Sequence, residues 1–248
     1  MNILVVNDDG INSTGFRALV DALSEAADVY VCAPSCQQSA KSHSITLGKA
    51  VAVREVKYDG AVKAYEVDGT PADCTKIGLQ FMEEQGIKIH MVYSGINLGS
   101  NLGRDTLYSG TVGAASEAAL AGIHGVAVSA DSHQATHFET AKKLAVDVID
   151  KIYGRLDTKI VISINVPDLP EEEIKGVHFA PLGNRFYDDR FYMNEEGNYE
   201  LSGKPSGLEI HPGCCDVREV AENYAVITPL QFDFTDYKAM EEIKEWEF

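Results

Sequence analysis

Two neighbouring aspartates follow the first apolar run of the chain and carry its clearest chemical signal. Residues 3–6 are apolar and mostly β-branched, as in a buried strand, and residues 7–10 read NDDG. In an open α/β sheet, ligands bind beyond the carboxyl ends of the strands. Two carboxylates at that position suit Mg²⁺, Mn²⁺ or a similar divalent cation, because such ions prefer hard oxygen ligands. The alternative is that Asp8 and Asp9 only cap a turn and the next helix.

The loop after the second apolar run is rich in small hydroxyl and amide side chains. That run covers residues 28–33, and residues 33–40 read APSCQQSA. Ser39 is a candidate neutral oxygen ligand for the same cation. Serines in loops are more often turn residues, so this loop alone is a weak signal.

A glycine-rich segment follows a later strand of the same kind. Residues 94–103 read SGINLGSNLG, and Asn97 offers an amide oxygen to a metal without adding negative charge. The glycines let the backbone approach a ligand closely. The segment lacks both the GK[ST] ending of a Walker A loop and the GxGxxG pattern of dinucleotide sites.

A helix is predicted to begin just after this segment, where residues 109–115 read SGTVGAA. Free N–H groups and the helix dipole favour a phosphate at such a helix start. The alternative is a glycine-rich turn with a serine N-cap. The candidate phosphate-binding residues are Ser109, Gly110, Thr111 and Asn97.

Alternating strands and helices must bring these loops together. Residues 2–150 alternate short apolar runs with helical patterns, which is typical of βαβ units on a largely parallel sheet. Strands are predicted at residues 3–6, 28–33, 90–94, 125–129 and 159–166, and a hairpin at residues 50–56 and 62–67. Helices are predicted from Asn12 or Ser13 onward, and over residues 71–82, 112–121 and 139–153. We therefore predict an α/β core over residues 1–167.

The composition of the sequence changes after Pro167, where polar, glycine- and proline-rich runs with scattered aromatics begin. Hairpins or an extended arm are predicted there, followed by a strand at residues 224–228 and an amphipathic helix at residues 235–246. Residues 168–248 are thus predicted to form a β-rich extension with a terminal helix that completes the single domain. Its aromatics are expected to pack against a partner subunit in preference to stacking on a nucleobase. The aromatics considered are Phe186, Tyr187, Phe191 and Tyr192, together with Tyr108 of the core.

Charge excludes two classes of partner. The 248 residues include 21 Lys+Arg and 38 Asp+Glu, which gives a formal net charge of −17. Binding to duplex nucleic acid or to an acidic membrane surface requires a basic face, and no cluster of Lys and Arg is dense enough to supply one. No apolar stretch approaches the ~20 residues of a membrane span, and residues 3–6 are too short for a signal sequence.

The chain contains an odd number of cysteines, five, and is large enough to fold without disulfides. A reducing cytoplasm is therefore the expected compartment. Cys214 and Cys215 are adjacent and no CxxC pair occurs, so structural zinc is not expected.

Six blocks of sequence, spread in order over nearly the whole chain, resemble one known family. They are ILVVNDDG at 3–10 with Gly15 following, QSAKSHSITL at 38–47, VDGTPADC at 67–74, SGINLGSNLG at 94–103, YSGTVGAASEA at 108–118 and ITPL at 227–230. Each block alone is a weak signal, but together they are very specific. They are similar to the SurE family of acid phosphatases and nucleotidases.

The resemblance implies both a site and an architecture. It implies one divalent metal ion per subunit and a phosphate-binding start of the helix after Ser109. It also implies a Rossmann-like three-layer core, a C-terminal arm exchanged between the subunits of a dimer or tetramer, and hydrolysis of 5'- and also 3'-nucleoside monophosphates, with polyphosphate as a substrate of some members. The implied metal ligands are Asp8, Asp9, Ser39 and Asn97.

Two positions depart from the family pattern. Residues 213–216 read GCCD where the family usually has Thr-Asp before a late helix, which affects only the local cap. His43 lies where family sequences vary, and we interpret it as a loop residue that forms hydrogen bonds and not as a catalytic one.

The residues suggest metal-assisted hydrolysis of a phosphomonoester, with water attacking phosphorus in line with the leaving alcohol. Asp8 or Asp9 is the candidate to orient or deprotonate that water. A phosphoaspartyl intermediate is a second possibility, although the spaced DxD pattern is absent.

A phospho-receiver module fits poorly, because the next run, residues 51–56, ends without an acceptor aspartate. A non-catalytic nucleotide- or metal-binding sensor would use the same loops without turnover.

Overall fold

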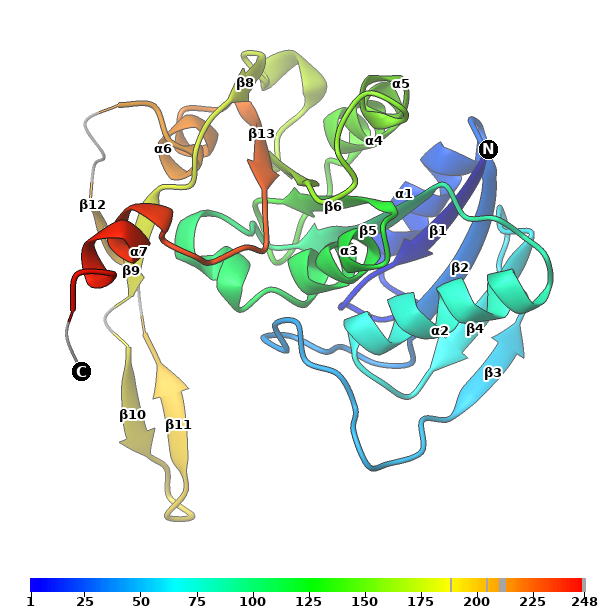
Figure 1. The fold of residues 1–248 in the computed structure, drawn as a ribbon, viewed down its shortest axis with the longest axis horizontal. Coiled ribbons are helices and arrows are strands. Elements are labelled where there is room, and N and C mark those ends of the chain that lie inside the picture. The colour runs from blue at the N-terminus through cyan, green and yellow to red at the C-terminus, as the bar shows by residue number, and fades with distance from the viewer. Residues whose placement is uncertain (188, 204, 210–212, 247–248) are drawn as a thin grey trace.

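A nine-stranded sheet runs through the middle of the molecule in the computed structural model, which describes residues 1–187, 189–203, 205–209 and 213–246 (Figure 1). In spatial order the strands are β3 (Val53–Val56), β4 (Lys63–Val67), β2 (Asp28–Pro34), β1 (Asn2–Val6), β5 (Met91–Leu98), β6 (His124–Ala130), β7 (Val161–Val166), β13 (Ala225–Leu230) and β8 (Val177–Phe179). The run from β4 to β7 is parallel, whereas β3 and β13 are antiparallel to β4 and β7. The predicted parallel core and hairpin are confirmed.

Helices cover both faces of this sheet and make three layers (Figure 1). One face carries α1 (Thr14–Ser24), α4 (Glu139–Asp147) and α5 (Ile149–Ile152), and the other carries α2 (Pro71–Glu84) and α3 (Gly110–Leu120). Strand β1 shows why both faces need cover, since Ile3 and Val5 belong to one core cluster and Leu4 and Val6 to the other. A strand buried on both faces reads as a continuous apolar run, as this one does.

Local signals in the sequence fix where the first helices begin. The hydroxyl of Ser13 accepts a hydrogen bond from the Phe16 N–H and caps α1. Helix α2 begins with a capping box between Thr70 and Asp73, and it carries a proline in its first turn. Gly15 lets α1 approach β5, because a Cβ at that position would lie 2.2 Å from the carbonyl oxygen of Ile96.

Several predicted boundaries were wrong. The helix predicted over residues 139–153 is two helices, α4 and α5, which meet at Val148. The strand predicted at residues 90–94 continues as β5 to Leu98. The terminal helix predicted over residues 235–246 is the shorter α7 (Tyr237–Ile243). It begins at Tyr237 because the Asp236 side chain accepts from the N–H groups of Lys238 and Ala239 and so caps its N-terminus.

The C-terminal region both extends the sheet and leaves it. Strands β13 and β8 continue the sheet beyond β7, and α6 (Asp216–Ala221) packs against β13. Four further strands form two antiparallel pairs: β9 (Asn184–Tyr187) with β12 (Pro205–Glu209), and β10 (Arg190–Met193) with β11 (Tyr199–Ser202). The β10–β11 hairpin extends away from the core in Figure 1, so the predicted arm is confirmed. The side chains of Phe186 and Tyr187 lie outside the described part of the chain.

Short 3₁₀ turns complete the secondary structure, namely η1 (Gly103–Leu107) and η2 (Glu171–Glu173). The first follows the glycine-rich segment after β5 and leads directly into α3. It therefore shapes the chain between two of the predicted site loops.

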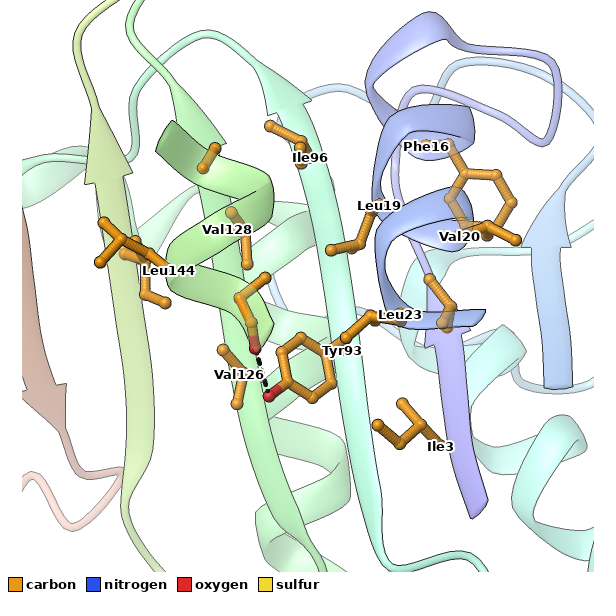
Figure 2. Packing of buried hydrophobic residues seen from close by; sticks show 14 of the residues in the cluster. Ile3, Phe16, Leu19, Val20, Leu23, Tyr93, Ile96, Val126, Val128 and Leu144 are labelled. Carbon is orange, nitrogen blue, oxygen red and sulfur yellow. Dashed lines mark hydrogen bonds between the residues drawn. The ribbon is translucent and has the colours of Figure 1, made fainter. Parts of the chain in front are cut away.

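The larger core cluster packs α1 and α4 against the central strands, with Tyr93 at its centre (Figure 2). Tyr93 is fully buried on β5, and its hydroxyl donates a 2.9 Å hydrogen bond to the carbonyl oxygen of Ala145 on α4. A buried hydroxyl needs such a partner, because burying it unpaired costs free energy. This bond fixes α4 against the strand that leads to Asn97.

Replacing Tyr93 with phenylalanine tests that contact. Tyr93→Phe removes one buried hydrogen bond without opening a large cavity, so we expect the free energy of unfolding to fall by about 1 kcal/mol. Chemical denaturation followed by circular dichroism measures the change. Tyr153→Phe is the matched control, because Tyr153 is 41% exposed. Equal effects of the two substitutions would contradict the assigned role of Tyr93.

Candidate functional site

The predicted site loops meet where the winding of the sheet reverses direction. From β1 the chain builds outward through β2 and β4, and it then returns to add β5, β6 and β7 on the other side of β1. The gap between the carboxyl ends of β1 and β5 is the switch point at which α/β sheets bind ligands. A cleft opens there. Its walls come from the loops after β1, β2, β5 and β6, and they include Asp8, Asp9, Gln37, Ser39, Asn97, Asn101, Asp105, Tyr108, Ser109 and His133.

Asp8 is the deepest charged group of the cleft. Its side chain is 6% exposed and accepts two hydrogen bonds from Thr111, one from the hydroxyl at 2.6 Å and one from the N–H at 3.1 Å. Burial raises the pKa of Asp8 to about 6, and the nearby charge of Asp9 adds to the rise. Keeping the Asp8 carboxylate charged in this buried position therefore costs free energy, even with the two hydrogen bonds from Thr111.

Asp9 is held by different elements from those that hold Asp8. The Leu98 N–H donates to one of its carboxylate oxygens at 2.9 Å, and the Gln37 amide lies 3.4 Å from the other. Burial raises the pKa of Asp9, while the bond from Leu98 and the nearby His133 oppose the rise. Asp8 thus receives its hydrogen bonds from α3, and Asp9 receives its bonds from β5 and from the loop after β2.

Asn97 and Ser39 both line the cleft beside the aspartates. The Asn97 amide donates through Nδ2 to the Gly99 carbonyl at 2.7 Å, which leaves its Oδ1 without a donor among the described residues. Ser39 is exposed in the loop after β2. The structure thus brings together all four predicted ligands, and they present two carboxylates, one amide oxygen and one hydroxyl.

The start of α3 is already engaged by the protein itself. Ser109 is the N-cap, and its hydroxyl oxygen accepts from the Val112 N–H at 3.0 Å. Thr111 is fully buried and gives both its N–H and its hydroxyl to Asp8. Gly110 fits against Asp8 because it lacks a side chain, since a Cβ there would lie 2.9 Å from the Asp8 carboxylate. Of the four predicted phosphate-binding residues, Ser109 and Asn97 line the cleft, whereas Gly110 and Thr111 pack against Asp8.

His43 lies away from the cleft, where it binds the buried carboxylate of Glu117 on α3. Its Nε2 is 2.8 Å from one oxygen of Glu117, and Lys76 Nζ is 2.5 Å from the other. Further along the same loop, Thr46 donates hydrogen bonds from its N–H and its hydroxyl to the carboxylate of Asp73 on α2. These bonds hold the loop that carries Ser39, which agrees with the interpretation of His43 as a residue that forms loop hydrogen bonds.

Several residues of the cleft were not predicted. Asn101, Asp105 and His133 line it, and His133 comes from the loop after β6, whose position at the carboxyl end of a parallel strand is the signal that could have identified it. Asp216 does not line the cleft but supports it. Its carboxylate accepts hydrogen bonds from the N–H groups of Gly103 at 2.7 Å and Gly183 at 2.6 Å. It thereby ties η1, one wall of the cleft, to the base of the arm.

The described lining of the cleft offers oxygen donors for a hard cation. One basic side chain lies next to it, since Arg185 Nη1 is 3.6 Å from a carboxylate oxygen of Asp105 and 3.3 Å from the Ser100 hydroxyl. The lining itself carries Asp8, Asp9 and Asp105, and no Lys or Arg occurs among the described residues that line the cleft. A cation held by these oxygens would offset their repulsion, so the donor set fits Mg²⁺ or Mn²⁺. Within the described part of the chain no three His, Cys, Asp or Glu side chains cluster, so an ion would also need the neutral ligands Ser39 and Asn97.

The strand order and the position of the cleft define a Rossmann-like α/β protein with its ligand site at the switch point of the sheet. The family model described as "Survival protein SurE" matches residues 3–189. The chain therefore belongs to the SurE family.

Relatives of the chain match over nearly their full length. A protein of Clostridium botulinum (strain Alaska E43 / Type E3) named 5'-nucleotidase SurE is 39% identical, with 99% of each chain covered. One of the same name from Clostridium beijerinckii is 38% identical, with 98% of each chain covered. The crystal structure of the SurE protein from Aquifex aeolicus has a TM-score of 0.84 and 36% identity, again over 98% of each chain. Within the described residues, no helix is both long and apolar enough to cross a membrane.

The raised pKa of Asp8 predicts how stability depends on pH in the absence of metal. The folded state binds a proton at Asp8 more tightly than the unfolded state does, so the contribution of Asp8 to stability is greatest below pH 4 and is lost as the pH rises through about 6. In Asp8→Asn, the amide can accept from the Thr111 N–H and donate to its hydroxyl. We expect this variant to be more stable than the metal-free parent protein by about 1–3 kcal/mol at pH 8, with the difference vanishing at pH 4.

Urea denaturation at a series of pH values, with a chelator present, measures this difference. Asp59→Asn is the control, because the Asp59 side chain is 94% exposed and its replacement should change stability little at any pH. A variant at position 8 that is less stable than the parent at pH 8 would contradict the assigned cost of the buried charge.

Proposed function

We propose that this protein is a divalent-metal-dependent phosphomonoesterase that hydrolyses nucleoside 5'-monophosphates to nucleoside and phosphate. Membership of the SurE family and the relatives named 5'-nucleotidase support the enzyme class. One observation carries the proposal. The carboxylate of Asp8 is buried beside that of Asp9, in a cleft with no Lys or Arg among its described lining residues, and this arrangement is electrostatically unfavourable. Such an arrangement is typical of a functional site and does not by itself stabilise a fold.

In this proposal, Asp8, Asp9, Ser39 and Asn97 hold one Mg²⁺ or Mn²⁺ ion. The bound ion would neutralise the charge of the phosphate and stabilise the charge that develops in the transition state. Of the residues predicted to bind phosphate, Asn97 and Ser109 line the cleft and would contact the phosphate oxygens, whereas Gly110 and Thr111 would act through Asp8, against which they pack. The Ser109 hydroxyl can donate to the phosphate, because its oxygen already accepts from the Val112 N–H.

The attacking water needs a group that orients it and takes its proton, and the two cleft aspartates are the candidates. Asp9 is the more accessible, because it is half-buried whereas Asp8 is buried. The cleft is open beside Gln37 and Tyr108, both of which are exposed. The proposal therefore extends to 3'-monophosphates and short polyphosphate as further substrates.

Phosphate release tests the proposed activity. We expect release from nucleoside 5'-monophosphates with Mg²⁺ or Mn²⁺, none with EDTA, and a loss of at least about 10²-fold in kcat for Asp8→Asn and Asp9→Asn. Nucleoside 3'-monophosphates and short polyphosphate belong in the same panel. Release that survives EDTA would overturn the metal dependence. Full turnover in both variants, with metal still bound, would remove the aspartates from the handling of water. No release under any condition would leave a binding or sensing role.

We further propose that residues 168–248 are an oligomerisation extension whose arm is exchanged between the subunits of a dimer or tetramer. The β10–β11 hairpin is two-stranded, and such a hairpin is marginally stable alone in water. Its apolar side chains are nevertheless exposed, by 65% at Phe191, 59% at Tyr192 and 58% at Leu201. Apolar surface of this kind marks a protein contact.

A double substitution tests this assembly. Phe191 and Leu201 are cross-strand partners, so Phe191→Ser with Leu201→Ser removes the centre of the apolar surface from both strands. We expect sedimentation velocity to show a multiple of the 27.0 kDa chain for the parent protein and a shift towards 27.0 kDa for the variant. Val62→Ser replaces an exposed apolar residue outside the C-terminal extension and should leave the mass unchanged. A monomeric parent protein would contradict the proposal.

A further inference from the structure

We propose that His133 is the general acid of the reaction and protonates the leaving oxygen of the nucleoside. This inference rests on the proposed phosphomonoesterase function. His133 lies in the loop between β6 and α4, and it lines the cleft together with Asp9 and Asn97. Strand β6 is the neighbour of β5, so this loop reaches the switch point from the side opposite to the loop after β2.

The backbone of β5 fixes the orientation of the imidazole. Nδ1 of His133 is 3.0 Å from the carbonyl oxygen of Leu98. A carbonyl oxygen only accepts hydrogen bonds, so Nδ1 carries a proton and Nε2 is the ring nitrogen available to a ligand. The ring packs closely on the backbone of Gly99, where a Cβ would lie 2.8 Å from its Cε1.

The same residue of β5 positions both His133 and Asp9. The Leu98 N–H donates to Asp9, and the Leu98 carbonyl accepts from His133. One peptide segment therefore fixes a carboxylate and an imidazole at the edge of one cleft. A carboxylate and an imidazole are the two kinds of group that a base and an acid require.

The chemistry needs such an acid. Water forms the new O–P bond, the bond between phosphorus and the ribose oxygen breaks, and its electron pair goes to that oxygen. A ribose alkoxide is strongly basic, so a proton delivered to it lowers the barrier. The donor is the imidazolium form of His133, in which Nδ1 keeps its proton on the Leu98 carbonyl and Nε2 carries the proton that is transferred. The cleft carboxylate takes the proton that the water loses, and exchange with solvent restores both groups. Among the described lining residues His133 is the only histidine, the side chain best suited to proton transfer near neutral pH.

The test compares two substrates that differ in their leaving groups. A nucleoside 5'-monophosphate releases a basic alkoxide, whereas p-nitrophenyl phosphate releases an acidic phenol that needs no proton. The variant His133→Asn keeps an N–H donor for the Leu98 carbonyl but has no acid. We expect its kcat to fall by about 10²–10⁴-fold with the nucleotide and by less than about tenfold with p-nitrophenyl phosphate.

His137→Gln is the matched control, because His137 is in the same loop but binds Asp168 and does not line the cleft. It should retain the parent kcat with both substrates. His133→Gln, with its amide placed further out, should repeat the substrate-dependent loss, and circular dichroism should show both variants folded. Equal losses with the two substrates, or no loss with the nucleotide, would overturn the role of His133. Absence of turnover in the parent protein would instead overturn the proposed function.

Discussion

The hydrogen-bonded pair of Asp8 and Thr111 joins the first strand of the sheet to helix α3, and the arrangement of the cleft depends on it. The buried carboxylate is stabilised by the hydroxyl and the N–H of Thr111 and by the dipole of α3. To make these bonds α3 must begin at Gly110, close against Asp8, where only glycine fits. The small residues at this helix start therefore serve the buried carboxylate, whether or not they also contact a phosphate. The neighbouring Asp9 is held separately, by the N–H of Leu98 on β5.

Those parts of the fold and site that depend on short-range patterns could be predicted from the sequence. A continuous apolar run followed at once by Asp8 and Asp9 indicates a buried parallel strand and a functional loop. Because the carboxyl ends of parallel strands share one edge of the sheet, the loops carrying Ser39 and Asn97 had to converge on the same place. The caps at Ser13 and Thr70 are visible in the same local way. Whether these residues bind metal stays a prediction.

Contacts between residues far apart in the chain could not be predicted in this way. Nothing near Thr111 in the sequence shows that its hydroxyl is committed to Asp8, 103 residues earlier. Asp216 binds the N–H of Gly103, 113 residues earlier, and so joins η1 to the base of the arm. His133 stands in a polar loop whose local pattern predicts only a turn, and its contact with Leu98 depends on the neighbouring positions of β5 and β6.

The electrostatics of the cleft explain why these long-range contacts matter for function. A chain of net charge −17, with aspartates lining its cleft, repels a phosphate ester unless a cation is held at that point. The hydrogen bonds from Thr111 and Leu98 keep two carboxylates close together without consuming all their lone pairs, so they can still bind an ion. Without a cation their repulsion and burial reduce stability. The ion and the substrate would therefore stabilise the folded cleft by the same interactions that make it reactive.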